Sequence, residues 1–90
     1  MPPTVDEARR RLRATLAVAA PDLTLDAAAV RWIPGPYPGF EYGLRLGQAN
    51  ALLFLPLEDL DGEGWETRLA ERLRQARAYL EAFPLARVRR

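Results

Sequence analysis

The sequence predicts an α+β domain with the element order helix, three strands, helix, in which both helices cover one face of a three-stranded antiparallel sheet. Three observations lead to this prediction. Apolar residues recur at helical spacing near both ends of the chain, they alternate in its middle, and proline or glycine separates the segments. We find no internal repeat and no linker, so we expect one domain over residues 1–90.

The first helix is expected over residues 4–20. Thr4-Val5-Asp6-Glu7 forms a capping box, in which Thr4 and Glu7 each bond the other's backbone amide. Pro21 ends the helix, because the residue before a proline is disfavoured in helical conformation. The expected apolar stripe consists of Val5, Ala8, Leu12, Leu16 and Ala19.

The strands are expected at residues 28–33, 40–46 and 51–57. Residues 22–29 stay open between helix, loop and strand, because alternating leucines are followed there by an alanine run. Three prolines make 34–39 a loop. The short connection after the middle strand predicts a hairpin. In that strand one face is expected to carry Phe40, Tyr42, Leu44 and Leu46, and the other Glu41, Gly43 and Arg45.

The second helix is expected over residues 62–83. Acidic residues gather at its start, which favours the positive end of the helix dipole, and Pro84 ends it. Residues 85–90 are expected to be a short, frayed basic tail. The expected core stripe consists of Trp65, Leu69, Leu73, Ala76, Leu80 and Phe83.

The composition weighs against catalysis. The chain has no His, Cys, Lys or Ser, so all thirteen of its basic residues are arginines, and most nucleophiles, general bases and soft metal ligands are missing. We therefore expect no catalytic residues and no cofactor. An enzyme based on carboxylates stays open as the third alternative, although a pair of Glu41 with Arg45 is the simpler reading of the one acid within a strand.

Net charge and hydropathy bear on the binding partners and the cellular location of the protein. The net charge of +1 is small for a dedicated nucleic-acid binder. No apolar run approaches the roughly 20 residues that span a bilayer, and the first residues do not have the pattern of a signal peptide. We expect a cytoplasmic protein without membrane contact. The bias towards Ala, Leu and Arg is typical of a GC-rich coding genome. One Asn, two Gln and no Cys also suit a thermophilic source, which avoids thermolabile residues.

A basic cluster near the start of the first helix is one candidate site. Arg9, Arg10 and Arg13 are possible phosphate contacts of a nucleic-acid-associated or regulatory module. Neighbouring helical residues point about 100° apart, so the arginines spread around the polar side. We expect ion pairs at helical spacing, Asp6 with Arg10 and Glu7 with Arg11, to account for the cluster.

The predicted element order is similar to that of the double-stranded-RNA-binding domains. That family places a cluster of lysines at the start of its second helix to hold phosphates. Here this position reads Glu63-Gly64-Trp65-Glu66, whose carboxylates repel phosphate. We therefore do not assign the chain to that family.

The acidic segment before the second helix is a weak candidate metal site. Asp59, Asp61 and Glu63 alternate, and Gly64 follows, as in the first half of a calcium-binding loop. The bidentate Glu of such a loop is replaced by Ala70. We expect the acids to serve helix capping and solubility.

An aromatic segment surrounds the proline-rich loop. Trp32, Tyr37, Phe40 and Tyr42 are half of the aromatic residues of the chain. Prolines reduce the entropy that a loop loses on binding, and Tyr and Trp are frequent interface residues, so these four are the candidate ligand or partner loop. The alternative is a loop that closes the end of the core.

The strand at 51–57 gives the leading functional hypothesis. It is apolar on both faces, with Leu52 and Phe54 on one and Leu53 and Leu55 on the other, and at a sheet edge it would need cover. A second copy is the economical cover. We expect a non-catalytic interaction or adaptor protein, homodimeric through these four residues by strand edge or sheet face, with an unidentified protein as a further possible partner.

Overall fold

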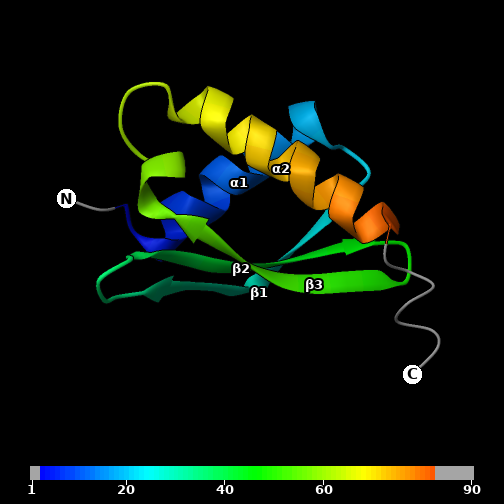
Figure 1. The fold of residues 1–90 in the computed structure, drawn as a ribbon, viewed down its shortest axis with the longest axis horizontal. Coiled ribbons are helices and arrows are strands. Elements are labelled where there is room, and N and C mark those ends of the chain that lie inside the picture. The colour runs from blue at the N-terminus through cyan, green and yellow to red at the C-terminus, as the bar shows by residue number, and fades with distance from the viewer. Residues whose placement is uncertain (1–2, 83–90) are drawn as a thin grey trace.

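The computed structural model describes residues 3–82, and it confirms the α+β class and the expected element order. The two helices lie side by side on one face of the sheet, and the other face has no helix over it within this range (Figure 1). The elements are α1 (Val5–Ala19), β1 (Thr24–Ile33), β2 (Gly39–Leu46), β3 (Ala49–Pro56), the 3₁₀ turn η1 (Leu57–Asp59) and α2 (Trp65–Ala82).

The sheet is antiparallel with the strand order β1-β2-β3, so β2 is central and β3 is an edge strand. The core lies between this sheet and the helices, because the stripes of both helices meet the inward residues of β2. All of the expected stripe residues of α2 up to Leu80 contribute to it, Trp65 only in part. From α1 and β2, the buried apolar side chains of the core are Ala8, Leu12, Leu16, Phe40, Tyr42 and Leu44.

Thr4 caps α1 as expected, but only half of the capping box forms. The Thr4 hydroxyl accepts a hydrogen bond of 3.1 Å from the backbone amide of Glu7. The carboxylate of Glu7 instead binds the guanidinium groups of Arg10 and Arg11. Two charged donors outcompete one neutral backbone amide for this carboxylate.

α2 begins at Trp65 and not at residue 62. Gly62 and Gly64 have φ angles of +87° and +79°, a left-handed backbone conformation that an α-helix does not contain. Both glycines therefore belong to the turn that precedes the helix. Phe83, Pro84 and the expected tail at 85–90 lie outside the described residues.

β1 begins four residues before the strand expected at 28–33, and its first half is irregular. Its pairing with β2 jumps from Asp26 opposite Gly43 to Arg31 opposite Glu41, so residues 27–30 stand against Tyr42 alone. Such a bulge bends the strand and strengthens its twist. Two hydrogen bonds hold it: Ala28 N–H donates to the Asp26 carboxylate, and Arg9 Nε donates to the Ala27 carbonyl.

The hairpin between β2 and β3 has a two-residue loop, Gly47-Gln48, in which only Gly47 has a positive φ. Glycine at the first central position is the pattern of a type II′ turn. β3 then runs over Ala49–Pro56, slightly ahead of the expected 51–57. Leu57 leaves the strand for η1.

Candidate interaction surface

The outward side chains of β3 make the main exposed apolar surface of the sheet. Leu52 is 59% exposed and Phe54 is 42% exposed, on the face away from the helices. Leu55 is fully buried under the helices, because successive strand residues point to opposite faces. We therefore remove Leu55 from the expected interface. Leu53 also points inward, but it is half-buried because β3 is the edge strand.

Two of the four residues expected at the ligand loop belong to the core. Phe40 and Tyr42 are buried, because they occupy inward positions of the central strand. Phe40 packs edge-to-face against Trp32, with ring centroids 5.1 Å apart. Burial raises the pKa of Tyr42 to about 12, so its hydroxyl stays protonated at neutral pH. Only Tyr37, 83% exposed, lies free on the loop.

An apolar hollow of about 560 Å³ connects the proline loop with β3. Pro36, Tyr37 and Pro38 form one wall, and Phe54 and Pro56 form the other. Its remaining lining residues are Leu57, Glu58, Asp61 and Gly62. The loop and the strand expected to act separately in binding thus share one surface.

Two glycines of β2 shape the outward face of the sheet. A Cβ on Gly39 would lie 2.6 Å from the Phe54 ring, so the phenyl group occupies the space above this glycine. Gly43 lies in an open hollow of about 610 Å³ that crosses the sheet between Asp26 and Leu52. Sequence reasoning did not single these glycines out. The alternation of inward and outward residues along β2 could have found them, because it places both glycines on the outward face.

Glu41 pairs across strands and not along its own strand. Arg31 stands opposite Glu41, and their side chains form a bond of 2.7 Å between Nε and Oε1. The expected partner, Arg45, is four residues along an extended strand, roughly 13 Å away. The prediction of a Glu41–Arg45 pair was therefore wrong.

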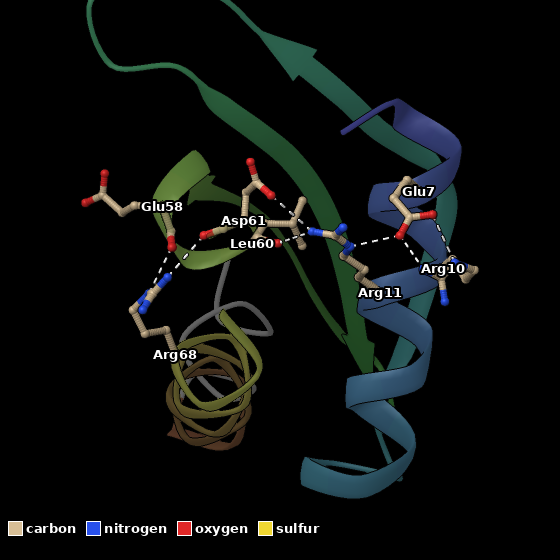
Figure 2. Close-up of polar contacts among 7 residues, drawn as sticks. All are labelled: Glu7, Arg10, Arg11, Glu58, Leu60, Asp61 and Arg68. Atoms are coloured by element: carbon tan, nitrogen blue, oxygen red, sulfur yellow. Dashed lines mark hydrogen bonds and ion pairs between the residues drawn. The ribbon is translucent and has the colours of Figure 1, made fainter. Parts of the chain in front are cut away.

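Arginines organise the loop that connects β3 with α2 (Figure 2). Arg68 of α2 donates to three backbone carbonyls of this loop: Glu58 at 2.8 Å, Glu63 at 2.8 Å and Asp61 at 3.1 Å. Arg11 reaches over from α1 to the carbonyl of Leu60 at 2.6 Å. A guanidinium group has five donors spread over a planar fork, so it can hold carbonyls that lie apart from one another, whereas a lysine has three donors on a single nitrogen.

Two of the three candidate metal ligands, Asp59 and Asp61, form ion pairs with arginines. Asp59 is buried and accepts from Arg72 Nε at 2.6 Å, and Asp61 lies 3.5 Å from Arg11. Within residues 3–82 no cluster of three or more acidic side chains has the geometry to hold a metal ion. The alternation of Asp59, Asp61 and Glu63 therefore does not converge on one point.

The expected phosphate contacts do not form a shared basic face. Asp6 pairs with Arg9, not Arg10 as expected, at 2.9 Å. Glu7 pairs with Arg10 and, as expected, with Arg11 at 2.9 Å. Arg13 is exposed one turn further along α1.

Glu7 gives a testable dependence of stability on pH. Hydrogen bonds from Arg10 and then Arg11 lower its pKa from 4.5 to about 2. A carboxyl group whose folded pKa is lowered contributes stability above its unfolded pKa, and this is lost as the pH falls through the folded pKa. We expect Glu7→Gln to be less stable than the original protein at pH 6, with the difference disappearing between about pH 4.5 and pH 2. Urea denaturation at several pH values measures this. A difference that stays constant with pH would contradict it.

Comparisons of the chain with protein-family models, with curated proteins and with solved structures found no match. No helix among residues 3–82 combines the length and the apolar character needed to cross a membrane. The function must therefore be argued from the chain's own surfaces.

Proposed function

We propose that this chain is a non-catalytic interaction protein that associates with a second copy of itself through β3. The observation that carries the proposal is the exposed, uncharged edge strand, with Leu52 and Phe54 on its outward face. Proteins normally protect such edges with charges, bulges or a covering element. Symmetric homodimers are the commonest soluble oligomers.

Two further features support a non-catalytic role. Eight of the twelve acidic side chains, namely Asp6, Glu7, Asp22, Glu41, Asp59, Asp61, Glu71 and Glu81, pair with arginines. The most buried hydroxyl, that of Tyr42, has a pKa that burial raises to about 12, which disfavours the phenolate that would act as a base or nucleophile. The nucleic-acid alternative depends on Arg9, Arg10 and Arg13, and carboxylates hold two of these three arginines, so we do not propose it. The cytoplasmic location and the thermophilic source stay predictions.

We expect the protein to behave as a dimer of about 20 kDa, twice the chain mass of 10.1 kDa, in light scattering at roughly 100 μM. The double variant Leu52→Ser, Phe54→Ser should return to the mass of one chain. These side chains are exposed, so their loss leaves the core intact.

The matched control is Val18→Ser. Val18 is 85% exposed on α1, and among residues 3–82 it is the most exposed large apolar residue away from β3. Its replacement should leave the dimer unchanged. A wild-type protein that stays monomeric up to roughly 1 mM would disprove self-association.

A further inference from the structure

The hydrogen bonds of the β2–β3 pair show which groups of β3 are free. Leu57 N–H donates to the Pro38 carbonyl at 3.1 Å, in continuation of the ladder that sets Leu55 opposite Phe40. Positions that bond the neighbour alternate with positions that face away from it in an antiparallel pair. The backbone groups of Leu55 and Leu53 therefore face β2, and those of Leu52, Phe54 and Pro56 face the open edge.

Pro56 falls on one of these outward positions. A proline has no N–H, so within the sheet it fits only where that group would not bond a neighbouring strand. The open edge thus carries both N–H and C=O groups at Leu52 and Phe54, and a carbonyl at Pro56. Pro56 also prevents a pairing strand from continuing far beyond it.

The other edge of the sheet is much less suited to pairing. Its strand, β1, is bulged at residues 27–30 and carries Asp26 and Arg31 beside the bulge. Bulges and charges are the usual protection of an edge strand. β3 is regular in its pairing and has no charged residue, so two copies of β3 meet no like-charge repulsion.

From this geometry, and resting on the self-association proposed above, we propose that two copies pair edge to edge, antiparallel, with the two-fold axis at Leu53. Leu52 then stands directly opposite the partner's Phe54, and Phe54 opposite the partner's Leu52. Leu53 meets the partner's Leu53 on the helix side of the sheet. The product is a continuous six-stranded sheet with all four helices on one face.

The side-chain pairs favour this register over a two-fold axis at Leu52. A two-fold axis at Leu52 would offer the same outward positions, but it would place Phe54 opposite a polar residue, the partner's Asn50. The axis at Leu53 makes two apolar pairs on the outward face and covers the half-buried Leu53 on the other. Directly opposite apolar pairs stabilise a sheet more than such mixed pairs.

The chain has no cysteine, so single cysteines report the register directly. Opposite residues of an antiparallel pair have Cα atoms about 4.5–5.5 Å apart, within disulfide range, whereas diagonal ones at about 7–8 Å exceed it. With oxidised glutathione, Leu53→Cys should form a covalent dimer. Leu52→Cys alone and Phe54→Cys alone should each form at least tenfold less covalent dimer than Leu53→Cys. When the two variants are mixed, they should cross-link to one another.

The mixture of Leu52→Cys with Phe54→Cys keeps the test valid if Leu53→Cys fails to fold. Leu52 and Phe54 are exposed, so their replacement leaves the core intact. Packing through the sheet faces would cross-link Leu52→Cys or Phe54→Cys alone and spare Leu53→Cys. An axis at Leu52 would cross-link Leu52→Cys alone. Either result overturns edge pairing at Leu53 while the dimer itself persists in light scattering. A monomeric wild-type protein would instead overturn the proposed function.

Discussion

Phe40→Ala should lower the free energy of unfolding by about 3–5 kcal/mol. Phe40 is fully buried in the central strand, between the helices and the ring of Trp32. Removing its phenyl group leaves a cavity that the surrounding sheet cannot close, because β2 is paired on both sides. Urea denaturation followed by circular dichroism measures the loss.

Tyr37→Ala is the matched control for Phe40→Ala. Both residues were expected at the same ligand loop, but Tyr37 is exposed. Its loss should change the free energy of unfolding by no more than about 0.5 kcal/mol. Equal effects at the two positions would contradict the division of the aromatic segment into a core part and a surface part.

The elements were predictable because their signals are local. The spacing of Ala8, Leu12 and Leu16, with Pro21 after them, specifies a helix without knowledge of the rest of the chain. The alternation from Phe40 to Leu46 likewise specifies which residues share a face of β2. Alternation does not say which elements cover that face, so the burial of Phe40 and Tyr42 could not be separated from a role at the loop.

The first half of β1 was not predictable for a physical reason. Ala27, Ala28 and Ala29 favour no strand, and their conformation depends on groups distant in sequence, above all Arg9 of α1. The contact of Arg11 with the connecting loop was missed for the same reason. Arg11 bonds the carbonyl of Leu60, 49 residues away, and only the packing of α1 beside the connecting loop brings the two together.

The strongest test of the outward surface is Gly39→Ala. The added Cβ would lie 2.2 Å from the backbone oxygen of Leu55 and 2.6 Å from the Phe54 ring. A side chain can rotate away, but the carbonyl belongs to the β2–β3 ladder and can move only if the pairing is distorted. We expect a loss of about 3 kcal/mol in the free energy of unfolding, from overpacking.

Gly43→Ala separates this steric effect from the mere replacement of a glycine. Its Cβ would meet the Cβ atoms of Ala29 and Asp26 at 3.2 Å and 3.3 Å, with no backbone atom among its three nearest contacts. The smaller conformational entropy of the unfolded alanine chain offsets part of this cost, so we expect a change within about 1 kcal/mol. Equal losses at both glycines would refute the steric argument.

Gly39→Ala and Gly43→Ala also test whether the position of the Phe54 ring affects dimerisation. Even where Gly39→Ala remains folded, its methyl group displaces the Phe54 ring from its place above the glycine. An interface that depends on Phe54 should then weaken more in Gly39→Ala than in Gly43→Ala. Light scattering over a dilution series measures this at a temperature where both variants are folded. If dimerisation is unaffected by Gly39→Ala in folded protein, the position of the Phe54 ring does not matter to the interface, and self-association must depend on the backbone edge alone.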